Sequence, residues 1–531
     1  MKRLTSLAIS ALLAGSAPAL AQDTHQHPAP EKLGNVHFET SCRPEVSASF
    51  DRAVALMHSF SFSAAKQGFD GVLAQDPTCA MAYWGIAMTH WSNPFAGIKT
   101  GPLLERGLAA AERGLTTGSP TARERDYIAA VRELYKDNTT ADHRTRIVAY
   151  EKAMEQLVAK YPGDREAAAF YALAITQTAL PTDKTFANQL KAAGMLEKLW
   201  AADPDHPGLA HYIIHALDHP PLAARALQAA RRYGTIAPSA PHALHMPSHT
   251  FTRVGAWQES IDTNIKSAES AIRDGVFAEA LHAMDYQVYA YLQTGQDAAA
   301  LRVVQQAPGI LARIDVNAMG GAAPPMAGFY AAAAIPARYA LERGKWAEAA
   351  ALQVRPTPTP AVDAITHFAR AVGAARSGNP QAAAADVTAL QALGEKLAAA
   401  KDAYWTEQVR IQREVALAWI ACAEGRRADA VAQLRAAAAA EDATDKSAVS
   451  PGPLAPAREL LADMLLEMKQ PADALVEFEA VMKKEPHRFR ATAQAARAAL
   501  LAGDKGKAGR YRAELLEIAK AGDKPGRADI R

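Results

Sequence analysis

The chain shows apolar positions three and four residues apart, interrupted at regular intervals by small or helix-breaking residues. Residues 456–486 contain one complete unit, with an apolar run through Leu465, a break at 469–471, a second run around Phe478 and a closing Pro486. Apolar residues at this spacing indicate amphipathic helices, and proline ends a helix because it has no amide hydrogen. The unit therefore predicts two helices joined by a short turn.

The same unit recurs along the chain at a step of about 34 residues, a period typical of helical repeats. Gly344 and Ala349, for example, are followed one such step later by Gly378 and Ala383. Clear units lie at residues 45–77, 240–273, 330–355, 364–395, 411–440 and 456–520. No stretch shows the alternating pattern of a β-strand, so we expect an all-α protein.

These units resemble the tetratricopeptide repeat (TPR), a helix–turn–helix unit of about 34 residues with a small residue between its helices and a closing proline. Residues 40–42 (Thr-Ser-Cys) and 79–85 (Cys-Ala-Met-Ala-Tyr-Trp-Gly) also resemble exported bacterial proteins that contain TPR domains. The resemblance implies a TPR-type solenoid of helical hairpins, an α-α superhelix. The concave groove of such a solenoid receives a peptide, a partner protein or a small ligand. The resemblance implies no particular reaction.

The first 21 residues have the features of a signal peptide. Lys2 and Arg3 give a positive start, a mostly apolar run follows at 4–13, and residues 19–21 (Ala-Leu-Ala) form a small-x-small cleavage site. We therefore expect cleavage after Ala21 and a periplasmic or secreted protein. No later stretch has the roughly 18 uninterrupted apolar residues that a membrane span needs, so none is expected.

Proline and glycine clusters divide the rest of the chain into two arrays. We expect an N-terminal TPR-like array at 45–315, which carries the histidine-rich groove, and an alanine-rich C-terminal array at 316–520. A lead segment at 22–44 and a tail at 521–531 flank them. The polar, then proline-rich segment 441–456 is expected to form a loop packed against the array.

Positive and negative charges are nearly balanced. The chain has 58 lysine and arginine residues against 56 aspartate and glutamate residues, a formal net charge of +2. Nucleic-acid binding needs basic residues that neutralise phosphates. The balance therefore argues against a nucleic-acid partner.

Two of the three cysteines, Cys42 and Cys79, flank the first predicted hairpin. The two ends of a helical hairpin lie close together, and an oxidising compartment allows a disulfide to persist. We expect a bridge between Cys42 and Cys79. The alternative is a pair of unpaired, buried thiols.

Two His-x-x-x-His pairs, His211/His215 and His245/His249, lie one repeat length apart. A step of four residues puts both members of a pair on one face of a helix, and a step of one repeat puts the pairs at equivalent places on neighbouring hairpins. We therefore expect four imidazoles to converge on one hollow. Pro247 is an objection, because it can kink or begin the helix between His245 and His249.

Positions counted back from the glycines between helices extend this set. His242 precedes Gly255 by the same number of residues as His282 precedes Gly295. In the same way, His245 and Asp285 occupy equivalent places three residues after these two histidines. In the TPR family these positions lie on the first helix of each hairpin and face the concave groove. The candidate metal ligands are therefore His211, His215, His242, His245, His249, His282 and Asp285.

Imidazole is the commonest side-chain ligand of transition metals, and two on successive turns can chelate one ion. A histidine-dominated set suits copper, zinc or iron and does not distinguish them. Two roles are open for Asp285 and for Asp218: to ligate the ion directly, or to orient an imidazole through its second nitrogen. Tyr212 and Tyr289 are candidates for hydrogen bonds to the ligands. The pairs lack the internal glutamate of the zinc-peptidase motif, so we infer no peptidase.

Three functions follow from these patterns. The first is an exported TPR-type binding protein whose histidine-lined concave groove coordinates a metal ion. The second is a metalloenzyme, hydrolytic or oxidative, that uses the same histidines. The third is a metal-free scaffold for protein–protein interaction. The patterns leave open whether the protein is an enzyme.

Overall fold

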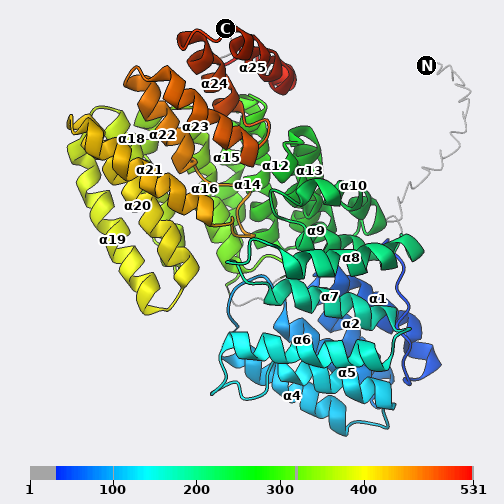
Figure 1. The fold of residues 1–531 in the computed structure, drawn as a ribbon. Helices are drawn as coiled ribbons and strands as arrows, with labels where there is room; N and C mark the ends of the chain where they lie inside the picture. The colour runs from blue at the N-terminus through cyan, green and yellow to red at the C-terminus, as the bar shows by residue number, and fades with distance from the viewer. Residues whose placement is uncertain (1–30, 100, 317–320, 525, 529–531) are drawn as a thin grey trace, which may run out of the picture. The chain divides into compact units, whose positions relative to one another are not determined.

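The computed structural model describes residues 31–99, 101–316, 321–524 and 526–528. The expected signal peptide at 1–21 lies outside the described residues, and the expected lead segment is described only from residue 31. Residues 32–531 form one compact unit. Its described residues form α-helices and short 3-10 helices and contain no β-strand (Figure 1), so the predicted all-α class is confirmed.

The elements before the histidine-bearing segment are η1 (Pro44–Val46), α1 (Ser47–His58), α2 (Phe62–Gln75), α3 (Ala80–Trp91), α4 (Pro102–Thr116), α5 (Ala122–Glu133), α6 (His143–Lys160), α7 (Arg165–Thr178) and α8 (Ala187–Ala202). The histidine-bearing segment and its neighbours comprise α9 (Pro207–Ala216), η2 (Ala223–Ala226), α10 (Leu227–Ile236), α11 (Pro241–His245), α12 (Pro247–Val254), α13 (Trp257–Arg273), α14 (Phe277–Gln293), α15 (Asp297–Leu311) and α16 (Pro325–Leu341). The remaining elements are α17 (Trp346–Ala350), α18 (Pro360–Arg376), η3 (Pro380–Ala383), α19 (Ala384–Ala399), α20 (Ala403–Ala423), α21 (Arg427–Ala443), α22 (Ala457–Glu467), α23 (Pro471–Lys484), α24 (Phe489–Leu501), α25 (Lys505–Ile518) and η4 (Ala519–Ala521).

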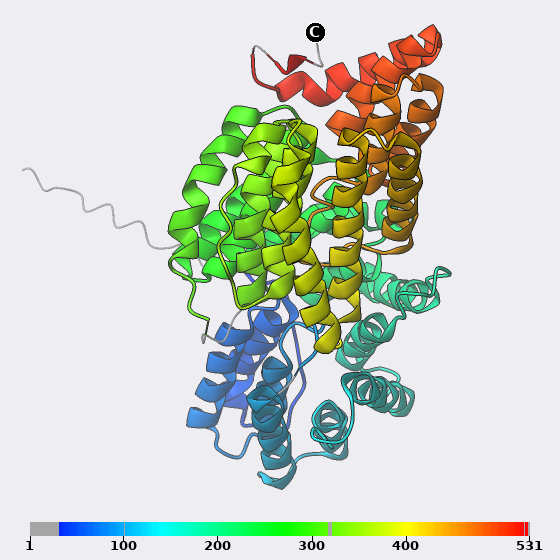
Figure 2. The same cartoon turned by 90° about the vertical axis from the view of Figure 1, so that its left-hand side faces the viewer.

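Helices that follow one another in the sequence pack against each other as hairpins. Helices α13 and α14, α20 and α21, and α24 and α25 are such pairs. Figures 1 and 2 show α18, α19 and α20 side by side, in agreement with their contacts. Helices α22 and α23 occupy the predicted unit at 456–486 and meet at its predicted break. The predicted TPR-type solenoid of helical hairpins is therefore confirmed as the fold class.

The turn after α12 shows why the repeat needs a small residue between its helices. Gly255 ends α12 with φ 71°, a left-handed conformation that side chains with a Cβ rarely adopt. A Cβ at Gly255 would also lie 2.4 Å from the carbonyl oxygen of Pro486. Glycine therefore allows the left-handed turn between α12 and α13, and it also leaves room for Pro486 to lie against that turn.

The expected division of the arrays near residue 315 falls between α15 and α16. Helices α14 and α16 pack against each other across this position. The assignment of two arrays remains a prediction. None of the described helices combines the length and the apolar composition that crossing a bilayer requires.

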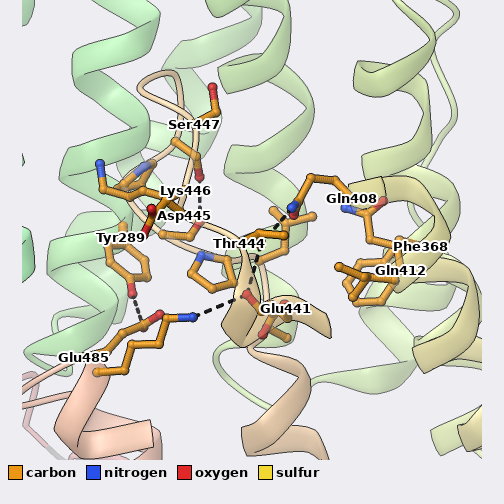
Figure 3. A pocket seen from close by; sticks show the side chains of 18 of the residues that line it. Tyr289, Phe368, Gln408, Gln412, Glu441, Thr444, Asp445, Lys446, Ser447 and Glu485 are labelled. Carbon is orange, nitrogen blue, oxygen red and sulfur yellow. Dashed lines mark hydrogen bonds between the residues drawn. The ribbon is translucent and has the colours of Figure 1, made fainter. Parts of the chain in front are cut away.

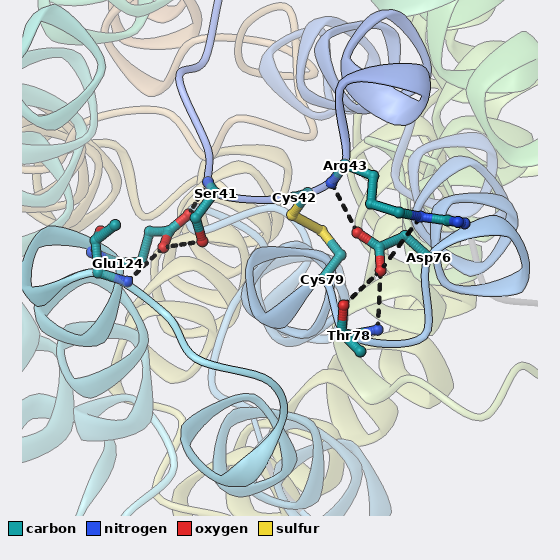
Figure 4. The surroundings of a disulfide bond; sticks show 8 residues. Ser41, Cys42, Arg43, Asp76, Thr78, Cys79 and Glu124 are labelled. Atoms are coloured by element: carbon teal, nitrogen blue, oxygen red, sulfur yellow. Dashed lines mark hydrogen bonds and ion pairs between the residues drawn. A yellow bond between two sulfur atoms is a disulfide. The ribbon is translucent and has the colours of Figure 1, made fainter.

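A disulfide joins Cys42 to Cys79, with 4.7 Å between their Cα atoms (Figure 4). The residues beside Cys42 are held as well. Ser41 donates from its amide and its hydroxyl to the carboxylate of Glu124, at 2.6 Å in both cases. The amide of Arg43 donates to Asp76 at 2.9 Å. The bridge therefore fixes a segment that hydrogen bonds already attach on both sides.

We expect the Cys42→Ser/Cys79→Ser variant to lose about 2–4 kcal/mol of unfolding free energy, because the bridge restricts the unfolded chain. The sequence separation of the two cysteines is 37. Chemical denaturation measures the loss. Cys422→Ser is the matched control, since Cys422 is a half-buried free cysteine. Equal stability of the double variant and the control would contradict the prediction.

Candidate metal centre

The six predicted histidines lie in the first arms of three consecutive hairpins, the second of which has an arm made of the two short helices α11 and α12. They are His211 and His215 on α9, His242 and His245 on α11, His249 on α12, and His282 on α14. The structure brings them together in two groups, in each of which one nitrogen per ring lies within 4.8 Å of the others. We call His211, His215 and His242 the first triad, and His245, His249 and His282 the second triad.

Pro247 begins a helix and does not separate the histidines around it. Helix α11 ends at His245 and α12 begins at Pro247. Proline is tolerated at this first position because the amide there has no partner inside the helix. The Nε2 atoms of His245 and His249 lie 3.1 Å apart, so the pair keeps a common face across the break.

In the first triad, the Nε2 atoms of His211 and His242 lie 3.2 Å apart. The Nδ1–H of His211 donates to the backbone carbonyl of His58 at 2.6 Å. The ring of His215 stacks on Phe95, with 4.4 Å between centroids, and its Nε2 is buried without a hydrogen-bond partner among the described residues. In the first triad, a hydrogen bond therefore fixes the ring of His211, and Nε2 of His215 has no hydrogen-bond partner among the described residues.

In the second triad, both members of the His245/His249 pair are anchored through Nδ1. The Nδ1 of His245 lies 2.7 Å from Oδ1 of Asn264, whose amide nitrogen donates to the carbonyl of Ser260 at 2.7 Å. The donation to Ser260 orients the amide, so its oxygen faces His245. The Nδ1 of His249 lies 2.9 Å from Oδ2 of Asp218.

These acceptors determine where the ring protons are. A carboxylate and an amide oxygen accept hydrogen bonds and cannot donate them, so Nδ1 of His245 and Nδ1 of His249 are both the donors. In a neutral imidazole the other nitrogen, Nε2, then carries a lone pair. The two Nε2 lone pairs face each other at 3.1 Å. Such a contact is repulsive unless a proton or a cation lies between the two nitrogens.

The surroundings do not supply that proton. Burial lowers the pKa of His245 well below its ordinary value and also lowers the pKa of His249, so both rings are neutral near pH 7. The hydroxyl of Tyr286 lies 3.3 Å from Nε2 of His249 and 3.2 Å from the carbonyl of Ser450. It has one proton for these two acceptors, and Nε2 of His245 remains without a donor.

The other four imidazoles are also held in the neutral, metal-binding form. Burial lowers the pKa of His211 and His282 to about 3 and lowers those of His215 and His242 well below the ordinary value. Protons therefore do not compete with a metal ion near pH 7. The Nδ1 atom of His282 is buried without a hydrogen-bond partner among the described residues.

Asp218 connects the second triad to two cations. Its carboxylate accepts from Nε of Arg253 at 2.8 Å and lies 3.4 Å from Nζ of Lys446. Burial alone would raise the pKa of Asp218, but Lys446 and Arg253 lower it well below the ordinary value. Asp218 is therefore ionised, and it accepts from Nδ1 of His249, which is one of the two roles that the sequence left open for it.

A cavity of about 40 Å³ adjoins both triads. Its walls include His215, His242, His245, His249 and His282, together with Glu279. This is room for more than one water molecule, since one needs about 10–15 Å³. Three segments, at 93–96, 322–324 and 448–449, also line the cavity. The histidines therefore lie beneath covering segments, five of them buried and His215 half-buried, whereas the sequence placed them on the face of a concave groove.

Residues 444–456, which connect α21 to α22, separate this cavity from a larger one. The larger cavity has about 90 Å³, and Figure 3 shows Lys446 and Glu441 in its wall. Its aromatic residues are Tyr289, Tyr330, Phe368, Tyr404 and Trp405. Ala448 and Val449 line the smaller cavity instead. The segment 441–456 is therefore packed against the array, as expected, and forms a common wall.

The structure does not place Asp285 among the imidazoles. Its carboxylate accepts from Nε of Arg338 at 2.8 Å, and both side chains are fully buried. Arg338 lies on α16 and also donates to the carbonyl oxygens of Gly452 and Pro453. The carboxylate that the sequence assigned to a metal is therefore engaged in an ion pair. We correct the assignment of Asp285 from metal ligand to structural residue.

The two predicted tyrosines contact other groups as well. The hydroxyl of Tyr289 donates to Glu485 at 2.9 Å, and the hydroxyl of Tyr212 lies 2.8 Å from Nδ1 of His58. Tyr286, one helical turn beyond His282, places its hydroxyl within hydrogen-bond distance of His249. Tyr286 and Asn264 escaped the sequence analysis because their types are common in helices and no spacing marked them.

A third group of ionisable residues, His58, Glu166 and His206, supports the first triad. Glu166 accepts from His58 at 2.8 Å and from His206 at 2.9 Å. The Nδ1 of His206 accepts from the amide of Leu209 at the start of α9. All ring nitrogens of this group have partners, so it is a structural network. It holds the helix of His211 and the carbonyl to which His211 donates.

No family model and no curated protein matches the chain. Among solved structures, an IFIT1 monomeric mutant with Gppp-AAAA shares 12% identity at a TM-score of 0.40, over 90% of this chain and 96% of its own. The APC/C hetero-tetramer Cut9–Hcn1 shares 11% identity at a TM-score of 0.33, over 90% of this chain and 87% of its own. Yeast Tom70 shares 11% identity at a TM-score of 0.26, over 90% of this chain and 92% of its own. Structural similarity at TM-scores this low supports no inference about a ligand or a partner of this chain.

We expect Asp285→Ala to lower the unfolding free energy by about 3–5 kcal/mol, because it leaves the buried Arg338 without its counter-charge. Metal content should stay unchanged, since Asp285 does not face the triads. The double variant Asp285→Ala/Arg338→Met should recover much of the stability. A loss of bound metal from the double variant, measured by elemental analysis, would show that Asp285 is a ligand after all.

Proposed function

We propose that this chain is a TPR-type helical-repeat protein that binds transition metal through its buried histidines. The contact between His245 and His249 carries the proposal. Their Nε2 lone pairs lie 3.1 Å apart while both Nδ1 atoms donate elsewhere. Two nitrogens bound to one tetrahedral ion at 2.0–2.1 Å lie on the order of 3.3 Å apart. The pair is therefore close to the geometry of two ligands that share one ion.

The hydrogen bonds around the triads support this proposal. A metal-binding histidine almost always donates its other ring N–H to a carboxylate or a carbonyl, which fixes the tautomer and the ring orientation. Asp218, Asn264 and the carbonyl of His58 do this for His249, His245 and His211. Neutral imidazole ligands suit copper, zinc and iron. We propose one of these metals.

We further propose that the protein works outside the cytoplasm, in the periplasm or after secretion. The proposal rests on the charged, apolar and small-x-small pattern of residues 1–21. The disulfide between Cys42 and Cys79 supports it, because disulfides persist in oxidising compartments. A repeat surface that binds a peptide or a partner protein is compatible with the buried metal.

One observation favours a metalloenzyme as a second candidate function. Three protein ligands leave a coordination position of the metal open, which is the arrangement of catalytic sites. Histidines of both triads line the cavity of about 40 Å³. A metal there would have room to activate water or dioxygen. Turnover that depends on the histidines would distinguish this candidate from a binding protein.

We expect the protein, purified without a histidine tag, to retain copper, zinc or iron after dialysis. Metal added at about 100 times its dissociation constant should raise the unfolding free energy by about 2.7 kcal/mol. The His245→Ala/His249→Ala variant should show a reduced metal content and a smaller rise. His90→Ala is the matched control, a buried histidine outside both triads. Absence of bound metal together with no stabilisation would overturn the proposed function.

Asn264 allows a test of the tautomer argument. We expect Asn264→Leu to weaken metal binding about 10–100-fold, because His245 loses the acceptor that orients its ring. Asn264→Asp keeps an acceptor oxygen at the same place and should bind metal about as well as the unaltered protein. Competitive titration with a chelator measures both. Equal affinities of the Leu and Asp variants would refute the role assigned to Asn264.

A further inference from the structure

We infer that the histidines hold two metal ions, one in each triad, with a small ligand bound between them in the shared cavity. This inference rests on the proposed metal binding and adds the number and arrangement of the ions. The bridging ligand would be a small anion or diatomic molecule, such as hydroxide, azide or dioxygen.

The ligand sets of the two triads are separate. No histidine belongs to both, and each triad has its own close Nε2 pair, at 3.2 Å for His211/His242 and 3.1 Å for His245/His249. Zinc binds four ligands in structural sites and three protein ligands plus water in catalytic sites. Six imidazoles are more than one such ion uses, whereas three imidazoles for each of two ions match the catalytic pattern.

The third member of each triad has a buried nitrogen without a partner. These atoms are Nε2 of His215 and Nδ1 of His282. Buried polar atoms are nearly always hydrogen-bonded, because leaving one unpaired is costly. Each triad therefore has an unsatisfied nitrogen of its own beside its own Nε2 pair. One ion would satisfy only one of the two triads.

The triads are close enough for two ions to act on one ligand. Ring centroids lie 6.0 Å apart for His242/His245 and 6.4 Å apart for His215/His249, which join different triads. Within the triads, His215/His242 and His249/His282 are 6.3 Å apart. The other pairs within the triads are closer, at 4.4–5.1 Å between centroids. The nearest rings of different triads are therefore about as far apart as the most distant rings within one triad.

The cavity supplies the place for the bridging ligand. Histidines of both triads line it, so the open coordination position of each ion would face the same space. Its volume of about 40 Å³ admits a ligand of a few atoms. Glu279 is the acidic residue in its wall, and its Oε1 accepts from the amide of Ala322 at 2.5 Å. The cavity wall therefore contains one carboxyl group, whose pKa burial raises to about 7.

The number of bound ions tests the inference. The tag-free full-length protein is stripped with a chelator, loaded with Zn(II), passed through a desalting column and analysed for metal per chain. We expect two zinc ions in the unaltered protein and in the control His90→Ala. We expect one in His211→Ala/His215→Ala and one in His245→Ala/His282→Ala, because each variant removes two ligands of one triad only.

The outcomes separate this inference from the proposed function. One ion in the unaltered protein and none in either variant would overturn the pair and leave a single shared site, with metal binding intact. No ion in the unaltered protein would overturn both. Circular dichroism checks that each variant is folded.

A second measurement needs no variant and covers the case in which a variant does not fold. The stripped protein is loaded with two equivalents of Cu(II) and examined by electron paramagnetic resonance. We expect magnetically coupled copper ions, seen as a lost or half-field signal, and a change in the spectrum when azide is added. A spectrum of isolated Cu(II) that azide leaves unchanged would overturn the inference.

Discussion

The facing lone pairs of His245 and His249 are the constraint on which this account depends. Asn264 and Asp218 take the Nδ1 protons, and burial keeps both rings neutral, so the two Nε2 atoms meet at 3.1 Å without a proton between them. A folded protein tolerates such a contact when a cation binds both nitrogens. The proposed metal binding therefore follows from where the ring protons lie.

The helical repeat creates this contact from ordinary backbone geometry. A four-residue step aligns two rings on one face, and a one-repeat step places the next pair on the neighbouring hairpin. Pro247 starts α12 and keeps His249 opposite His245. The groups that orient the rings come from other elements: Asn264 lies on α13 and Asp218 follows α9. Several hairpins thus have to pack correctly before the site exists.

The sequence predicted the helical hairpins and all six converging histidines, because repeat spacing reports where a residue lies on a helix. It did not predict which neighbour takes each side chain. Asp285 has the expected register but pairs with Arg338, 53 positions away in the chain. The covering segments and the division into two triads depend on the packing of distant loops. No local pattern records either of them.

The most direct test is a crystal structure of the metal-loaded protein with anomalous diffraction measured at the absorption edge of the metal. The account predicts an anomalous peak between His245 and His249, about 2.0–2.1 Å from Nε2 of each ring. A map without a peak there, with the two nitrogens still in contact or with a peak elsewhere in the chain, would contradict it.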